Sequence, residues 1–169
     1  YKRFRKKLAD WLSDNYYGDE VNTTDNIINE DELFICNGIT QALHLIMTVY
    51  MYQDDTILVE DPSYFIMINI FKDFGLDIEA ISMEEDGIDI DELEDKVSSL
   101  SKTQERVFLY TIPINHNPTG ITMSYEKRLE LCKIPNLTIF SDEVYQLLYF
   151  DEPPPPSLSL LSENVISLG

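Results

Sequence analysis

Short apolar runs alternate with helical patterns along most of this 169-residue chain. Each run has the length of a buried strand, and most runs are separated by apolar residues at helical spacing. The runs lie at 33–36, 56–60, 78–82, 107–111, 137–141 and 165–168, and the helical patterns lie at 41–52, 64–74, 91–100 and 124–132. This alternation predicts an α/β fold, a three-layer α/β/α sandwich around a mostly parallel sheet.

One further helix is expected before the first strand. Phe4, Leu8, Trp11 and Leu12 recur at helical spacing and Gly18 stands where a helix would stop, which predicts an amphipathic helix over 2–17. Five basic residues lie within it, and the interleaved apolar residues indicate a solvated helix face rather than a targeting or nucleic-acid patch. These basic residues are Lys2, Arg3, Arg5, Lys6 and Lys7.

The composition narrows the class of protein. The chain has 12 Lys and Arg residues and 31 Asp and Glu residues, so its formal net charge is 12 − 31 = −19, and neither nucleic acid nor an anionic membrane is expected as a partner. No stretch approaches the roughly 20 apolar residues that span a bilayer. Cys36 and Cys132 have no metal-binding or redox spacing, which predicts no metal site and fits a reducing, cytoplasmic compartment. The apolar content suits one core, so 1–169 is expected to be one domain or a large piece of one.

The loops that leave the predicted strands are where a ligand is expected, because open parallel sheets bind ligands beyond the carboxyl ends of their strands. Gly38 stands directly before a helix, so free backbone N–H groups and the helix dipole would face an anion such as a phosphate. A plain turn with Thr40 as the helix N-cap would give the same pattern.

Asp142 is the second candidate, because it ends the apolar strand over 137–141. An unpaired carboxylate would be costly there, so a cationic partner is expected, and the protonated ring nitrogen of a cofactor would serve. Alternatively, Asp142 caps the next turn. The string Asn117-Pro118-Thr119-Gly120 is compatible with ordinary turn chemistry, but it follows a buried strand.

Five strings together resemble the fold type I, class I/II aminotransferases, which depend on pyridoxal 5′-phosphate (PLP). The resemblance covers almost all of the chain, in the order and spacing of the family, and looks closest to the branch with kynurenine and 2-aminoadipate aminotransferases and the aminotransferase-like domains of some bacterial regulators. The strings are Asn37-Gly38-Ile39-Thr40-Gln41-Ala42-Leu43, Glu60-Asp61-Pro62-Ser63-Tyr64, Asn117-Pro118-Thr119-Gly120, Ser141-Asp142-Glu143-Val144-Tyr145 and Val165-Ile166-Ser167-Leu168-Gly169.

The resemblance implies a cofactor-binding role for each matching residue. The turn at Gly38, the backbone N–H groups of Ile39 and Thr40, and the Thr40 hydroxyl would bind the cofactor phosphate. Tyr64 would stack on the pyridine ring.

Three further residues would act on the ring itself. Asn117 and Tyr145 would donate hydrogen bonds to its phenolic oxygen, and Asp142 would pair with the ring nitrogen and keep it protonated. A protonated ring withdraws electrons from the carbanion that forms when the substrate loses its α-proton. Asp142 and Tyr145 are therefore the expected catalytic residues within this chain.

The chain also departs from the family pattern. The Schiff-base lysine normally lies a few residues beyond the position of Gly169, and Ser99-Leu100-Ser101-Lys102 imitates its motif at the wrong place in the order, so Lys102 is expected on the surface. The substrate-binding arginines, the small domain and the N-terminal segment are missing, and the chain between Cys132 and Asn136 is shorter than usual. We therefore expect 1–169 to be a partial PLP-binding large domain.

The resemblance implies a homodimeric enzyme of amino acid metabolism or biosynthesis that transfers an amino group from an amino acid to a 2-oxo acid. Alternatives are a non-catalytic PLP-binding sensor domain of a transcription regulator, a PLP lyase of the same fold, or an inactive remnant. His116, beside Asn117, could touch substrate, although a loop histidine is more often structural or solvated, and His44 on a helix is interpreted as a packing residue.

Overall fold

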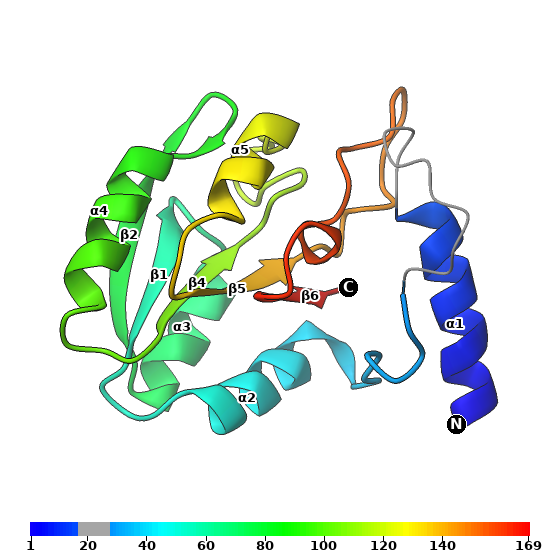
Figure 1. Ribbon diagram of the computed structural model, residues 1–169, viewed down its shortest axis with the longest axis horizontal. Coiled ribbons are helices and arrows are strands. Elements are labelled where there is room, and N and C mark those ends of the chain that lie inside the picture. The colour runs from blue at the N-terminus through cyan, green and yellow to red at the C-terminus, as the bar shows by residue number, and fades with distance from the viewer. Residues whose placement is uncertain (17–27) are drawn as a thin grey trace.

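Six strands form the central sheet of the structure, a computed structural model that describes residues 1–16 and 28–169 (Figure 1). The strands follow the order β3-β2-β1-β4-β5-β6, and all neighbours are parallel except the antiparallel pair β2 and β3. They are β1 (Thr56–Asp61), β2 (Asp77–Glu84), β3 (Gly87–Ile88), β4 (Val107–Thr111), β5 (Leu137–Asp142) and β6 (Val165–Leu168). The mostly parallel sheet predicted from the sequence is confirmed.

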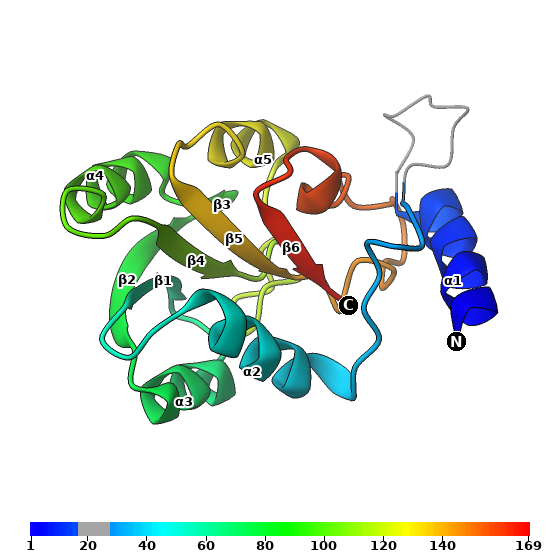
Figure 2. The same ribbon diagram turned by 60° about the horizontal axis from the view of Figure 1, so that its bottom comes forward.

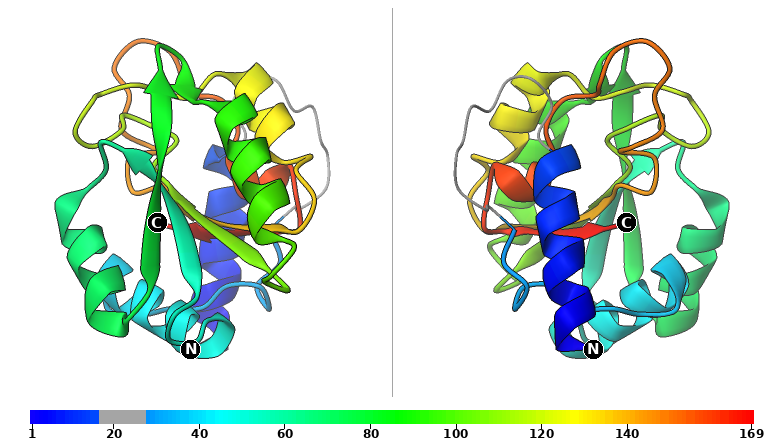
Figure 3. Two further views of the ribbon diagram at one scale, coloured as in Figure 1. Left: turned by 90° about the vertical axis from the view of Figure 1, so that its left-hand side faces the viewer. Right: turned by 90° about the vertical axis from the view of Figure 1, so that its right-hand side faces the viewer.

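Helices cover both faces of this sheet, as Figures 2 and 3 show. Helices α2 (Gly38–Tyr50) and α3 (Phe65–Phe74) lie on one face, and α4 (Ile90–Leu100), α5 (Tyr125–Leu131) and the short η1 (Leu158–Leu160) lie on the other. The predicted three-layer sandwich is thereby confirmed. A further helix, α1 (Lys2–Asn15), stands beside the sandwich.

Two hydrophobic clusters, one on each face, follow from the alternation of side chains along the strands. On β4, Phe108 and Tyr110 pack into the cluster beneath α2 and α3, whereas Val107 and Leu109 pack into the cluster beneath α4, α5 and η1. Successive residues of a strand point to opposite faces, so the whole of β4 can be buried. The same alternation decides the face toward which each polar residue at a strand end points.

The predicted strand over 33–36 is wrong. These residues have no regular structure, and the Phe34 side chain is 75% exposed. A short apolar run specifies no pairing partner, and both edges of the sheet are formed by other strands, β3 and β6. The two-residue β3 was not predicted, because it is too short to show an alternating pattern.

The ends of the helices differ from the predicted ones by up to three residues. Helix α1 ends at Asn15, and Gly18, the predicted stop, lies outside the described residues. Helix α2 begins at Gly38 rather than at position 41, and its N-cap is Asn37, so the alternative reading of Thr40 as N-cap is wrong. Helix α5 covers most of the predicted 124–132, and five residues separate its end from β5, which begins at Leu137.

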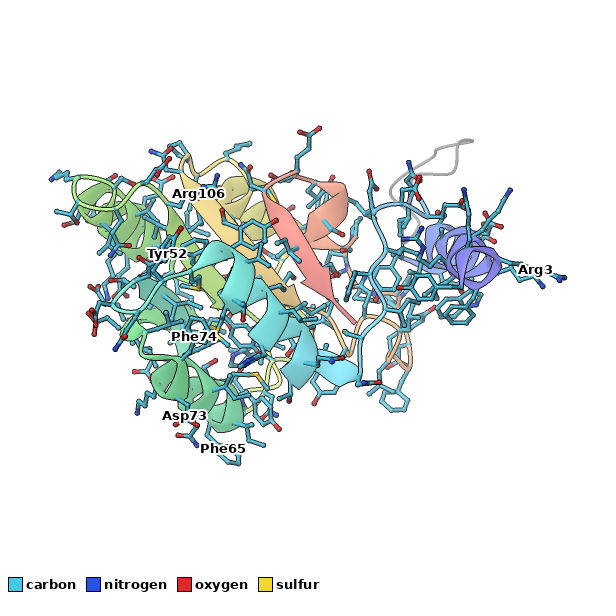
Figure 4. All side chains as sticks on the ribbon, turned by 90° about the horizontal axis from the view of Figure 1, so that it is seen from below. Arg3, Tyr52, Phe65, Asp73, Phe74 and Arg106 are labelled. Atoms are coloured by element: carbon cyan, nitrogen blue, oxygen red, sulfur yellow. The ribbon has the colours of Figure 1, made fainter. Side chains whose placement is uncertain are left out.

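The basic cluster of α1 faces solvent as predicted. Lys2, Arg3, Lys6 and Lys7 are exposed, and Arg5 is half-buried with its Nη2 atom 3.1 Å from an Asp31 carboxylate oxygen. Figure 4 shows Arg3 projecting outward from this helix. Among the described residues, no helix combines the length and the apolarity needed to cross a membrane.

Candidate functional site

A cavity of about 260 Å³ lies at the carboxyl edge of the sheet. This volume is close to the lower end of the roughly 300–1,000 Å³ range that is typical of small-ligand pockets. Six of the seven predicted cofactor-binding residues line it, and the seventh, Gly38, directly precedes one of them. The lining residues are Ile39, Thr40, Tyr64, Met67, Ile112, Asn117, Asp142, Val144 and Tyr145.

The first turn of α2 forms one wall of the cavity. Gly38 has a positive φ of 81°, which turns the chain sharply into the helix at little steric cost. The Asn37 side chain makes no capping hydrogen bond, and the Gln41 side chain accepts from the Asn37 backbone N–H instead. The N–H groups of Ile39 and Thr40 thus lie at an uncapped, electropositive helix end beside the cavity.

Asp142 is the buried acid of the cavity. It ends β5 and is only 5% exposed. Its Oδ2 atom accepts a hydrogen bond of 2.7 Å from the Tyr110 hydroxyl on the neighbouring strand β4, and its Oδ1 atom accepts a long one of 3.5 Å from the Val144 backbone N–H. The carboxylate therefore caps the following turn weakly, as the alternative reading had it, and its nearest protein donor is a hydroxyl. The expected cationic partner, the ring nitrogen of a cofactor, stays a prediction.

Burial determines the electrostatics of this acid. Desolvation raises the pKa of the Asp142 carboxyl above its ordinary value, and the hydrogen bond from Tyr110 lowers it part of the way back. The pKa of the Tyr110 hydroxyl is raised far above its usual range, first by burial and then by Asp142, so this hydroxyl stays protonated and donates. A cationic group placed at the free side of Asp142 would favour the ionised carboxylate.

Three polar side chains complete the wall of the cavity. Tyr64 is the N-cap residue of α3, and its ring meets that of Phe65 edge-to-face at 5.6 Å between centroids. Asn117 follows β4 in the loop that ends at Gly120, and Tyr145 follows β5 and packs against the hydrophobic cluster. All three are half-buried and so combine a fixed position with access to the cavity. Their contacts with a cofactor remain predictions.

The remaining sequence candidates lie elsewhere. Lys102 is exposed after α4, as predicted. His44 is exposed on α2 and meets the ring of Phe74 edge-to-face at 6.2 Å, a peripheral contact rather than core packing. His116 is 1% exposed and does not line the cavity, so the structural reading of this histidine is the one that holds.

Tyr110 is the site residue that sequence reasoning missed. It lies in an apolar run, where a tyrosine reads as an ordinary strand residue. The one hint in the sequence is that Tyr110 lies in a strand expected to be buried, because a buried tyrosine hydroxyl needs a hydrogen-bond partner. That partner is 32 positions away, and no local pattern identifies it.

Comparison with known proteins gives the family context of this cavity. The sequence model described as "Aminotransferase class I and II" matches residues 1–168. The uncharacterized HTH-type transcriptional regulator YisV of Bacillus subtilis (strain 168) is 32% identical over 169 residues, which cover 97% of this chain and 33% of that protein. Aromatic-amino-acid aminotransferase 1 of Thermococcus litoralis is 33% identical over 171 residues, which cover 98% of this chain and 39% of the enzyme.

A solved structure agrees with these relatives. LysN, the α-aminoadipate aminotransferase of Thermus thermophilus, was crystallised with N-(5′-phosphopyridoxyl)-L-leucine and superposes with a TM-score of 0.78 at 30% identity. The match covers 99% of this chain and 40% of LysN. The chain thus spans between one third and two fifths of the length of each of these three proteins.

Proposed function

This chain belongs to the class I and II aminotransferase family, and from that premise we propose that it is part of the cofactor-binding large domain of a PLP-dependent aminotransferase. The reaction would transfer an amino group from an amino acid to a 2-oxo acid. The observation that carries the proposal is the single cavity that gathers an uncapped helix N-terminus, a half-buried tyrosine and a buried carboxylate.

The residues present fit such a cofactor by chemistry. The N–H groups of Ile39 and Thr40 at the start of α2 suit a phosphate dianion. The Tyr64 ring offers an aromatic face at the cavity wall, and Asp142 offers an anion whose pKa is raised by burial and whose hydrogen-bond donors in the described residues are both uncharged. Anion-binding, stacking and cation-binding groups are the three that a phosphorylated, protonated pyridine requires.

When bound, PLP supplies an electron sink for the α-carbon of the amino acid. The chain's own residues would orient and charge it. Asp142 would hold a proton on the ring nitrogen through a charge-assisted hydrogen bond, and Asn117 and Tyr145 would donate hydrogen bonds to the phenolic oxygen. The wall formed by Met67 and Ile112 would exclude water from one side of the ring.

Part of the machinery is proposed to lie outside these 169 residues. None of the residues that line the described cavity is a lysine. The Schiff-base lysine, the small domain and the arginines for the substrate carboxylate would therefore belong to the rest of a longer protein, and the isolated chain would not turn over. Homodimerisation and a cytoplasmic location belong to the same proposal, and sedimentation of the full-length protein would test the first of them.

Equilibrium dialysis of the chain with PLP tests the site directly. We expect reversible binding that the double variant Tyr64→Ala, Asp142→Ala weakens about 100-fold, because two contacts worth about 1.4 kcal/mol each are lost. The matched control is Tyr52→Ala, Asp73→Ala, which removes one exposed tyrosine and one exposed aspartate outside the cavity. Equal binding by the site variant and its control would refute the assignment.

Product analysis of the full-length protein tests the reaction. Incubation with an amino acid and a 2-oxo acid should convert the first into its 2-oxo acid and the second into its amino acid in equal amounts. Release of ammonia or another fragment without formation of the second amino acid would instead support a PLP lyase.

A second candidate is supported by one observation. YisV, a relative that matches almost the whole chain, is named a transcriptional regulator. We therefore keep as an alternative that this domain is the PLP-binding sensor of a regulator. Specific DNA binding by the full-length protein that changes with PLP, together with no amino-group transfer, would favour this alternative over the enzyme.

A further inference from the structure

A buried acid and imidazole lie beneath the loop that carries Asn117. Glu60, near the end of β1, and His116, directly before Asn117, are each 1% exposed. The His116 Nε2 atom lies 3.1 Å from the Glu60 Oε2 atom, although off the line of an ideal hydrogen bond. The His116 Nδ1 atom lies 2.8 Å from the Thr119 Oγ1 atom. One imidazole ring therefore connects the sheet with the far end of the loop.

Glu60 is itself fixed to the sheet. Its carboxylate accepts hydrogen bonds from the Thr111 hydroxyl and, at 3.0 Å, from the Ile112 backbone N–H. These donors come from β4 and the residue after it, so the acid joins the ends of two adjacent strands. Two such bonds to a charged group give His116 a rigid anchor.

This pair lies on the face of the sheet opposite to Asp142. Leu58 and Leu109 point toward α4 and α5. Glu60 and Thr111 follow them by two positions and so share that face. The cavity lies on the other face, with Tyr110 and Asp142. Asn117 lines the cavity, whereas His116 does not.

The loop therefore straddles the edge of the sheet, with adjacent side chains on opposite sides. Its backbone is closed through the same residue, because the His116 N–H donates to the Ile121 carbonyl at 2.8 Å and the His116 carbonyl accepts from the Gly120 N–H. A change in the position of His116 would move Asn117 with it, since the two residues share a peptide bond.

We propose that Glu60 and His116 form a positioning pair that holds the Asn117 side chain in the cavity and thereby sets the affinity of the site for an aromatic ring. The identity of that ring rests on the proposed function, but the positioning does not. Neither residue touches the cavity, so both act through Asn117.

Amide hydrogen exchange of the chain without ligand tests the positioning. In His116→Ala the amide of Gly120 should exchange at least about tenfold faster, while the amides in the middle of α2 keep their rates. His44→Ala, which removes the other histidine of the chain, is the matched control and should leave the loop unchanged. Unaltered Gly120 exchange in His116→Ala would overturn the proposal.

Ligand binding separates positioning from a general loss of structure. PLP should bind about tenfold more weakly to His116→Ala, whereas inorganic phosphate, which needs only the start of α2, should keep its affinity within about twofold. Equal losses for both ligands would overturn the proposal in favour of a structural role. If the wild-type chain binds phosphate but not PLP, the proposed function fails while the exchange result still decides the fate of the pair.

Conservative variants distinguish the contribution of the His116 Nε2 atom, which faces Glu60, from that of the Nδ1 atom, which faces Thr119. His116→Gln keeps a donor near the Nε2 position, and we expect it to restore most of the PLP affinity, whereas His116→Asn keeps one only near Nδ1 and should not. The reverse order would remove Glu60 from the proposal.

Should His116→Ala fail to fold, the exposed Thr119 offers a milder test. Thr119→Val removes the hydroxyl beside Nδ1 at constant shape and should weaken PLP binding about threefold, while Thr119→Ser should bind like wild type. Equal affinities for these two variants would overturn the proposal.

Discussion

Asp142 and Glu143 are adjacent buried acids, yet they lie in very different surroundings. The Glu143 carboxylate is 1% exposed and accepts from four donors of the protein, including the Leu158 backbone N–H at 3.1 Å. Asp142 is 5% exposed, with one short donor and one long one. The remaining donors to Glu143 are the hydroxyl groups of Ser141, Ser157 and Ser167.

The two carboxylates differ in how many more hydrogen bonds each could accept. Glu143 ties β5, the segment before η1, and β6 together, and the protein meets its hydrogen-bonding capacity. Asp142 faces a cavity with capacity to spare. A buried acid that the protein leaves incompletely satisfied is a candidate for ligand binding, whereas a fully satisfied one is a structural anchor.

Replacement of Glu143 should give the largest effect. Glu143→Ala leaves three buried donors and one half-buried donor, Ser167, without their acceptor, and we expect the free energy of unfolding at pH 7 to fall by about 3 kcal/mol or more. Urea unfolding followed by circular dichroism measures this loss. Asp142→Ala, the matched truncation next door, should lose less than half as much, and equal losses would remove the distinction between anchor and ligand site.

The donor to Asp142 comes next in size. Tyr110→Phe deletes the hydroxyl at constant shape and leaves the Asp142 Oδ2 atom without its short hydrogen bond, which should lower the free energy of unfolding by about 1–2 kcal/mol. Because that bond lowers the pKa of Asp142, its loss should raise the pKa further. Carboxyl carbon NMR across a pH titration reports the shift, with the exposed Tyr52→Phe as control. An unchanged Asp142 titration would show that Tyr110 does not tune this acid.

The smallest effect is a gain in stability. At pH 7 without ligand, Asp142→Asn should raise the free energy of unfolding by on the order of 1 kcal/mol, because it removes a buried charge and keeps an oxygen for the Tyr110 hydroxyl. Urea unfolding of the variant beside wild type measures the gain.

The sign of its pH dependence follows from the raised pKa of Asp142 in the folded state. The folded chain holds the proton more tightly than the unfolded one, so wild-type stability falls as pH rises from about 4 through the folded pKa. The gain in Asp142→Asn should therefore be absent near pH 4, grow through that window and then level off. A loss of stability that does not vary with pH would mean that Asp142 is an anchor like Glu143.

Sequence reasoning succeeded where structure is locally encoded. The strands at 107–111 and 165–168 were predicted with their observed bounds, because each is a compact, mostly apolar run that directly follows a polar residue, Arg106 or Asn164. The start of α2 was predicted three residues late, because Gly38 is a poor helix former. The helix begins at Gly38 because the turn that leads into it requires a positive φ. The run at 33–36 shows the limit, since its composition suits a strand but the sheet offers it no partner.

The site was predictable to a similar depth. Four of the five strings located segments whose side chains meet in the cavity, because strand ends of a parallel sheet gather at one edge, whereas the string over 165–169 contributes no residue to its wall. Tyr110 and the contact between Glu60 and His116 escaped detection because they depend on neighbours 32 and 56 positions apart in the chain. Such contacts depend on which face of the sheet each strand residue points to and on which strands are neighbours. Both are known only once the sheet is assembled.

The cavity wall is assembled from segments that lie between positions 39 and 145. No short piece of the chain contains all of these segments. A ligand of the cavity should therefore bind the folded chain and not the unfolded one. Ligand at about 100 times its dissociation constant would add about 2.7 kcal/mol to the free energy of unfolding. Ligand binding therefore depends on the folded state of the whole sheet. A rise in melting temperature on adding ligand would show that strands far from the point of contact are also folded.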